Sequence, residues 1–166
     1  MTTKDRINTR RAKADDAPVV VELIKSLAHF EQLTLPDEET QSRLVRDGFG
    51  KKPRFTTLLA EVNGKVVGYA IMFETYSSFL ALPTLFLEDI FILPEYRGVG
   101  AGLALFKQCV AEAECRGCGR MEWMTLHWNI RAQNFWKKLG AKHLKEWYPY
   151  RLVRPQFAAI LSGQQK

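Results

Sequence analysis

The segment from Leu85 to Ala113 constrains the fold of this chain more than any other. It begins with the apolar stretch LFLEDIFIL, continues with the glycine-rich turn PEYRGVGAG, and passes into a helical pattern near Gly102. The first N–H groups of a helix have no partner within the helix, and together with the helix dipole they attract anions. The segment therefore predicts a turn that binds a pyrophosphate, next to a strand covered on both sides.

This turn does not match the two most familiar nucleotide motifs. The phosphate-binding loop Gly-x-x-x-x-Gly-Lys-[Ser/Thr] needs a lysine directly after its second glycine, but here the first lysine after the turn is Lys107. A dinucleotide-binding unit has its strand at the start of the domain and an acidic residue after a second strand. Here a hairpin pattern precedes the strand, and no such acid follows, so another nucleotide-like cofactor is indicated.

The strand itself carries two adjacent carboxylates. Strict alternation places one set of residues on one face and the rest on the other: Leu85, Leu87, Asp89, Phe91 and Leu93 against Phe86, Glu88, Ile90 and Ile92. A carboxylate in such a strand is unfavourable unless it is paired, protonated or open to a water-filled cleft. Two interpretations stay open: structural hydrogen bonds where the strand widens, or a functional cleft.

Around this segment the chain predicts one α/β domain. Ahead of it we expect a tail at residues 1–7, a strand at 8–14, helices over 15–33 and 36–48, a hairpin that turns at Asn63-Gly64, and a loop at 75–84. After it we expect a parallel strand near 121, a helix at 129–139, a hairpin at 143–153 and a helix at 156–161. With 166 residues and 46% hydrophobic content, the chain suits one core, in a single domain at residues 8–162.

Composition limits the partners. The net charge of +6 is spread along the chain, as on a solvated surface, and no nucleic-acid-binding motif accompanies it, so no nucleic acid is expected. No apolar run approaches the roughly 20 residues of a membrane span. Three cysteines without a signal peptide favour the cytoplasm. The histidines His29, His127 and His143 are spaced too irregularly for a metal site, and none is expected.

The pattern Arg97-x-x-Gly100-x-Gly102 after a buried strand resembles the acyl-CoA signature of the GCN5-related N-acetyltransferases (GNAT). The resemblance covers nearly the whole chain. It is closest to the spermidine/spermine (diamine) and thialysine N-acetyltransferases, and the matching pieces include Leu23–Lys25, Phe30-Glu31, Asp47–Gly50, Leu87–Asp89, Tyr96–Gly98, Trp128-Asn129 and Asn134-Phe135. It implies an α/β (α+β) fold, with a mixed central sheet of about six to seven strands flanked by helices on both faces.

The resemblance also implies acetyl-CoA as co-substrate and a small-molecule primary amine as acceptor. The residues implied for the cofactor are Ile90, Phe91, Ile92, Arg97, Gly98, Val99, Gly100, Ala101, Gly102, Leu103, Asn129 and Asn134. Those implied for the amine are Phe30, Glu31, Glu88 and Asp89. An alkyl ammonium has a pKa of ~10.4 and must lose a proton before it attacks the thioester. Glu88 corresponds to the residue thought to accept that proton, whereas Glu31 could also be an ordinary helix-end charge.

Two departures from the family pattern bear on function. Trp136 stands where the family has a tyrosine that can protonate the CoA thiolate, and an indole is no acid near neutral pH. Either Trp136 stabilises the thiolate by hydrogen bonding, or another tyrosine takes over, or the chain is an acyl-CoA-binding module with little activity. Ser77 stands where the resemblance implies a loop acid, and Tyr148 and Tyr150 stand about where it implies an acidic residue and a tryptophan. With fewer acids, a small or amino-acid-like amine is at least as well suited as a long polyamine. The resemblance implies a homodimer.

Overall fold

The computed structural model describes residues 5–163. Of the tail expected at residues 1–7, the first four residues lie outside the described part. The chain divides between Met124 and Thr125 into two compact units, called here the first and the second unit. Each is described by itself.

The first unit is built on a mixed sheet. Its strands are β1 (Ile7–Arg11), β2 (Thr56–Val62), β3 (Lys65–Ser77), β4 (Leu82–Ile92) and β5 (Arg120–Trp123). They follow the order β1-β2-β3-β4-β5, and every pair is antiparallel except β4 and β5, which are parallel. The predicted parallel neighbours are thus confirmed. Within residues 5–163 the sheet has five strands, fewer than the six to seven expected.

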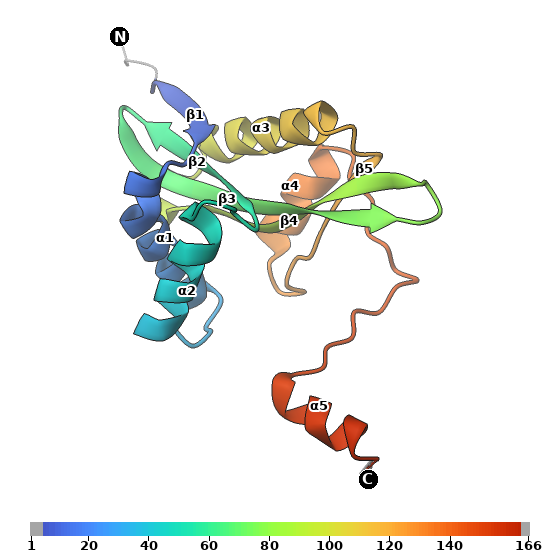
Figure 1. Cartoon of the computed structure of the whole chain (residues 1–166). Coiled ribbons are helices and arrows are strands. Elements are labelled where there is room, and N and C mark those ends of the chain that lie inside the picture. Colours follow the sequence, from blue (N-terminus) through green and yellow to red (C-terminus); the bar gives the residue numbers. More distant parts are fainter. Residues whose placement is uncertain (1–4, 164–166) are drawn as a thin grey trace. The chain divides into compact units, whose positions relative to one another are not determined.

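Helices cover both faces of this sheet, as predicted. Helices α1 (Ala17–Phe30) and α2 (Glu38–Phe49) lie on one side, and α3 (Ala101–Cys115) lies on the other (Figure 1). Pro18 stands in the first turn of α1, and the side chain of Asp37 caps α2 by accepting a hydrogen bond from the Thr40 N–H. Short 3₁₀ helices span Ala14–Asp16 and Pro94–Tyr96.

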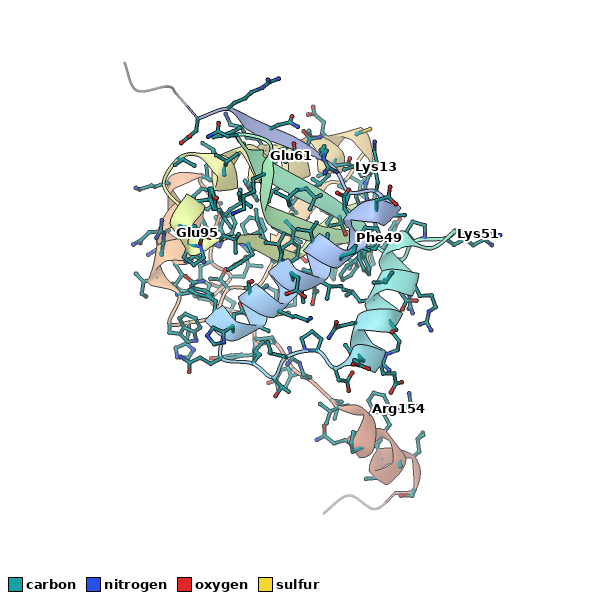
Figure 2. All side chains as sticks on the ribbon, turned by 90° about the vertical axis from the view of Figure 1, so that its left-hand side faces the viewer. Lys13, Phe49, Lys51, Glu61, Glu95 and Arg154 are labelled. Atoms are coloured by element: carbon teal, nitrogen blue, oxygen red, sulfur yellow. The ribbon has the colours of Figure 1, made fainter. Side chains whose placement is uncertain are left out.

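The core on the α1 side joins that helix to the three central strands. Its buried members are Val20, Leu23, Leu59, Tyr69, Ile71 and Phe91. Phe49, the last residue of α2 and labelled in Figure 2, packs against this cluster. Both helices are therefore held to the sheet by apolar contacts.

Two hairpins connect the central strands. The Asn63-Gly64 turn joins β2 and β3 with φ of 53° and 84°, the left-handed pair that a two-residue hairpin needs, so this prediction is confirmed. The loop predicted at residues 75–84 is wrong. Thr75 pairs with Thr84 and Tyr76 with Pro83, so β3 and β4 continue as a long ribbon and only residues 78–81 form the turn.

A β-bulge interrupts β4 at Glu88. Ile71 pairs with Asp89, but the next residue of β3, Met72, pairs with Leu87, so Glu88 is an extra residue. Neighbouring residues of β3 point to opposite faces, and therefore Leu87 and Asp89 do as well. The predicted alternation, which put both on one face, is wrong. Asp89 instead lies on the face of the α1-side core.

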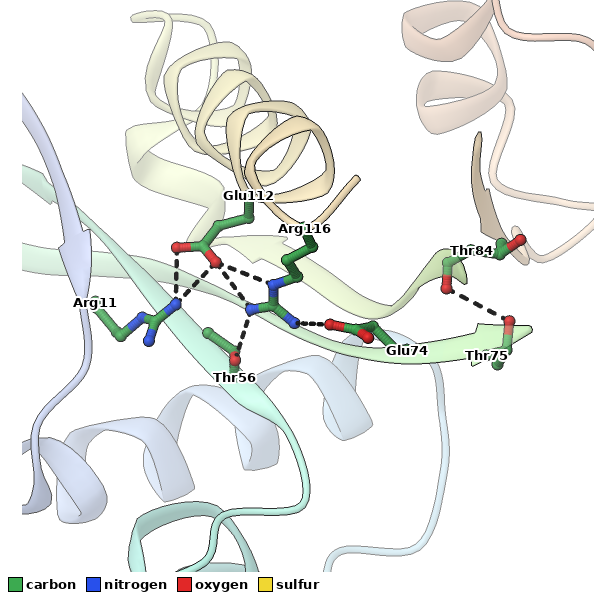
Figure 3. A network of polar contacts seen from close by, with 7 residues as sticks. All are labelled: Arg11, Thr56, Glu74, Thr75, Thr84, Glu112 and Arg116. Atoms are coloured by element: carbon green, nitrogen blue, oxygen red, sulfur yellow. Dashed lines mark hydrogen bonds and ion pairs between the residues drawn. The ribbon is translucent and has the colours of Figure 1, made fainter. Parts of the chain in front are cut away.

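A network of polar contacts ties the end of α3 to the sheet (Figure 3). Arg116 donates hydrogen bonds from Nη2 to Glu112 Oε2 at 2.8 Å and to Thr56 Oγ1 at 2.9 Å. Its Nη1 lies 3.4 Å from Glu74 Oε1, and Arg11 of β1 reaches Glu112 Oε2 at 2.8 Å. Three strands and one helix are thus joined by these groups, of which Glu112 and Arg116 are partly shielded from water while Arg11 and Glu74 are exposed.

The second unit contains α4 (Ile130–Lys138) and α5 (Arg154–Leu161). Both helices were predicted, and Gly140, with φ of 83°, follows the last turn of α4 as expected. The hairpin predicted at 143–153 is wrong, because these residues form no strand. An isolated two-stranded hairpin is marginal in water, and the described part of this unit has no further strand to support one. No helix among residues 5–163 has the length and apolar character to cross a membrane.

Candidate active site

The glycine turn has the backbone of an anion site. Gly98 and Gly100 have φ of 92° and 101°, a conformation that residues with a side chain rarely adopt. Gly100 is the N-cap of α3, and the first backbone bond into the helix runs from Ala104 N–H to its carbonyl at 3.0 Å. In the described chain no backbone hydrogen bond starts from the N–H groups of residues 98–103. These donors stand at the positive end of the helix dipole, and residues 98–100 are exposed.

Beside the turn, β4 has an open edge. The parallel pairing with β5 runs from Thr84 to Leu87 and stops there. From Asp89 to Ile92 the strand keeps its β3 partner, and from Glu88 to Ile92 it has no strand partner on the other side within the described residues. Unpaired N–H and C=O groups of a strand edge bind an extended ligand. The implied cofactor residues Ile90, Phe91 and Ile92 all lie on this edge.

Arg97 connects the turn to the end of α1. Its Nε donates a hydrogen bond to the Ile92 carbonyl at 2.9 Å, and its guanidinium lies 4.7 Å from the Phe30 ring centre and 5.4 Å from that of Phe91. The two rings are 6.2 Å apart. The side chain of Arg97 therefore braces the turn against the strand and against Phe30, one of the residues implied for the amine.

Three carboxylates lie close enough for their charges to interact. Glu31 is the C-cap residue of α1, and Glu88 and Asp89 are at the bulge of β4. Glu31 and Glu88 are both close enough to Asp89 for their charges to act on its pKa. The structure thus brings together Phe30, Glu31, Glu88 and Asp89, the four residues expected to bind the amine.

Burial raises the pKa of Asp89 to about 6, and the charges of Glu88 and Glu31 act in the same direction. The Tyr69 hydroxyl, which donates a hydrogen bond to Asp89 Oδ2 at 3.1 Å, opposes this by stabilising the charged form. Burial also raises the pKa of Glu31. The side chain of Glu88 is exposed to solvent.

No lysine or arginine within residues 5–163 forms an ion pair with any of these three carboxylates. This holds although the chain carries a net charge of +6. Gathered carboxylates without a cation repel one another and raise the free energy of the site. A cationic ligand relieves that repulsion.

The other three residues from the sequence prediction belong to the second unit. Asn129 is the N-cap of α4 and accepts a hydrogen bond from Ala132 N–H through its side chain at 3.1 Å. Asn134 is exposed. Trp136 is buried, and its Nε1 donates a hydrogen bond to Thr125 Oγ1 at 2.9 Å. The indole has one N–H, so it would have to give up Thr125 before donating to another group.

Sequence reasoning missed Tyr69. The available signal was a tyrosine in the middle of an apolar strand, because a buried phenol needs a hydrogen-bond partner. Its partner could not be named, since the bulge decides which face Asp89 takes. No cluster of three or more histidine, cysteine or acidic side chains capable of holding a metal ion occurs in the described part of the chain.

Comparisons with known proteins place the chain in a family. The model of the acetyltransferase (GNAT) family matches residues 21–141. Thialysine N-epsilon-acetyltransferase of Mus musculus is 34% identical over 153 residues, which cover 86% of this chain and 89% of that protein. L-ornithine N5-acetyltransferase NATA1 of Arabidopsis thaliana is 29% identical, with 91% of this chain and 86% of that protein covered.

Among solved structures, an aminoglycoside N-acetyltransferase in complex with CoA has the same fold. The TM-score is 0.75 at 19% identity, and the match covers 92% of this chain and 98% of the other.

Proposed function

Because this chain belongs to the acetyltransferase (GNAT) family, we propose that it transfers the acetyl group of acetyl-CoA to a primary amine of a small molecule. The acceptor is a diamine, a polyamine or an amino-acid-like amine. The observation that carries this choice is the group of Glu31, Glu88 and Asp89, which has no basic partner in the described chain. An ammonium group supplies the missing positive charge.

The cofactor side of the proposal rests on the turn and on the edge of β4. The free N–H groups of residues 98–103 would hold the pyrophosphate, and the edge at residues 90–92 would pair with the extended pantetheine arm. When bound, acetyl-CoA supplies an activated acetyl group on a thioester. Asn129 and Asn134, which the family resemblance implied for the cofactor, stay a prediction.

On the amine side, Asp89 and Glu31 bind and orient the ammonium group next to Phe30. The amine must lose a proton before it attacks the thioester carbon, and we assign the acceptance of that proton to Glu88. Glu88 is exposed, so it can pass the proton to water. Separate carboxylates thus bind the cation and remove its proton.

The CoA thiolate leaves without the tyrosine proton donor that the family pattern implies. Stabilisation by Trp136 was one of the alternatives left open, but its indole N–H is already donated to Thr125. A thiolate with a pKa near ~8.5 is an adequate leaving group without a protein acid. We therefore propose that it departs unaided and takes its proton from water, while Trp136 maintains the fold around α4.

The names of two relatives suggest which amines to consider as acceptors. One is a thialysine and another an L-ornithine acetyltransferase, so both act on amino acids with a terminal amine. We propose an acceptor of this size, because the group of three carboxylates is small for a long polycation. A single domain over residues 8–162, a homodimer and a cytoplasmic location belong to the same proposal.

An amine panel tests the proposed function. The full chain is incubated with acetyl-CoA and with thialysine, ornithine, lysine, putrescine or spermidine, and free CoA thiol is measured. We expect saturable, amine-dependent release, with a higher kcat/KM for thialysine or ornithine than for spermidine. Tight acetyl-CoA binding without turnover of any amine would instead make the chain an acyl-CoA-binding module.

A further inference from the structure

Tyr69 is fully buried, and its neighbours in the α1-side core are apolar. A phenylalanine would fill the same space without bringing a polar atom into the core. The hydroxyl therefore needs a partner, and it has one, because it donates to Asp89 Oδ2 at 3.1 Å. No other hydrogen bond links the side chains of β3 and β4 in the described chain.

The bulge makes this contact possible. Tyr69 pairs with Phe91, and Ile71 pairs with Asp89, so all four side chains lie on one face of the sheet. If the ladder continued regularly from Leu87, Glu88 would pair with Ile71, and Asp89 would pair with Ala70 and point to the α3 side, away from Tyr69. The backbone thus brings one phenol and one carboxylate together in an otherwise apolar layer.

We propose that Tyr69 is a positioning residue for acetyl transfer, whose buried hydroxyl holds the Asp89 carboxylate charged and oriented toward the acceptor ammonium. This inference rests on the proposed function. Tyr69 itself contacts neither the amine nor the cofactor in this scheme; it acts through Asp89.

The charged groups around Asp89 explain why it needs such a donor. Glu88 faces it from β4, Glu31 from the end of α1 and Tyr69 from β3. Both carboxylates and burial oppose ionisation, and no lysine or arginine of residues 5–163 pairs with Asp89. Of these groups the Tyr69 hydroxyl alone favours the charged form, and burial raises its own pKa, so it remains a donor.

Amine binding should depend on pH through the charge of Asp89. With its pKa raised to about 6, Asp89 is charged at neutral pH and is neutralised as the pH falls through that value, so amine binding is lost on the acid side. Removing the Tyr69 hydroxyl removes a stabiliser of the charged form. The loss of binding then begins at a higher pH.

The test is the pH profile of kcat/KM for the amine in wild type and Tyr69→Phe. One hydrogen bond to a charged group corresponds to an upward shift of about one pH unit in the acid limb, and to a roughly threefold lower kcat/KM near pH ~6.5. We expect the change mainly in the KM for the amine, with the KM for acetyl-CoA unchanged. In an Asp89→Asn background, Tyr69→Phe should shift nothing further.

Ile71→Val is the matched control, because it loosens the same face without touching a hydrogen bond. An unshifted acid limb in Tyr69→Phe, or an equal shift in Ile71→Val, would overturn the role of the hydroxyl. A ¹³C NMR titration of the Asp89 carboxyl reads the same shift without turnover. If wild type acetylates no amine, the proposed function fails, while this titration still decides whether Tyr69 controls Asp89.

Discussion

Replacing Gly100 by alanine should weaken acetyl-CoA binding through strain in the backbone of the turn, without a steric clash of the added methyl group. Gly100 has φ of 101°, and an added Cβ would meet only Ile7 Cδ1, at the ordinary contact distance of 3.5 Å. The left-handed region is unfavourable for an L-residue by about 1–2 kcal/mol. If the turn relaxes to escape this strain, its N–H groups no longer converge, and the affinity falls by roughly 5- to 30-fold.

Gly102 offers a matched control two residues further on. It lies within α3 at an ordinary helical φ, and an added Cβ would come no closer than 3.7 Å to Ile92 Cγ1. Alanine is favoured over glycine in a helix by up to about 1 kcal/mol. Gly102→Ala should therefore keep the affinity for acetyl-CoA and raise the thermal stability slightly.

Isothermal titration calorimetry with acetyl-CoA, together with thermal unfolding of the free protein, measures both effects. Gly100→Ala should lose affinity while Gly102→Ala does not. Wild-type affinity in Gly100→Ala would refute the requirement for the left-handed turn. An equal loss in both variants would show that any added methyl group blocks the ligand, so turn conformation would not be the cause.

The remaining predictions concern the proton and the thiolate. Glu88→Gln should lower kcat/KM mainly at pH values well below the amine pKa of ~10.4, where free amine is scarce, and an unchanged pH–rate profile would remove Glu88 from the mechanism. Trp136→Phe loses the 2.9 Å bond to Thr125 and should destabilise the protein by about 1–2 kcal/mol in denaturant unfolding. Its kcat near pH ~8 should stay within about threefold of wild type, because a thiolate of pKa ~8.5 leaves unaided; a collapse of kcat with retained folding would place the indole in the chemistry.

The strand, turn and helix around Gly100 could be predicted because the information is local. Glycines at the required positions, an apolar strand before them and a helical pattern after them are all visible in one short segment. The Asn63-Gly64 hairpin was predictable for the same reason. In both places the backbone conformation allows few residue types.

The grouping of the carboxylates was predictable only through family resemblance. Alternation along β4 gave the wrong face for Asp89 relative to Leu87, because a bulge is defined by the pairing with β3 and leaves no clear mark in β4 itself. The Tyr69 contact depends on that bulge and was missed with it. The register between β3 and β4 depends on residues far apart in the sequence, and a local pattern does not contain it.

At the C-terminal end, the sequence predicted a hairpin that does not form. Residues 143–153 contain aromatic residues suited to strands, such as Trp147 and Tyr150, and Pro149 suited a bend. A strand also needs a neighbour to pair with, and the described part of the second unit provides none. These residues do have high strand propensity, but a strand forms only where another strand pairs with it.

The bulge at Glu88 also affects how residue roles are transferred between related proteins. In a regular strand, residues an even number of positions apart lie on the same face. Here the bulge at Glu88 interrupts this alternation, so the rule fails for pairs of residues on either side of it. Two relatives with the same acidic pair would present them differently if only one had the irregularity. Residues after Glu88 should therefore be matched by counting back from the glycine turn, and residues before it by counting forward from the β3–β4 ribbon.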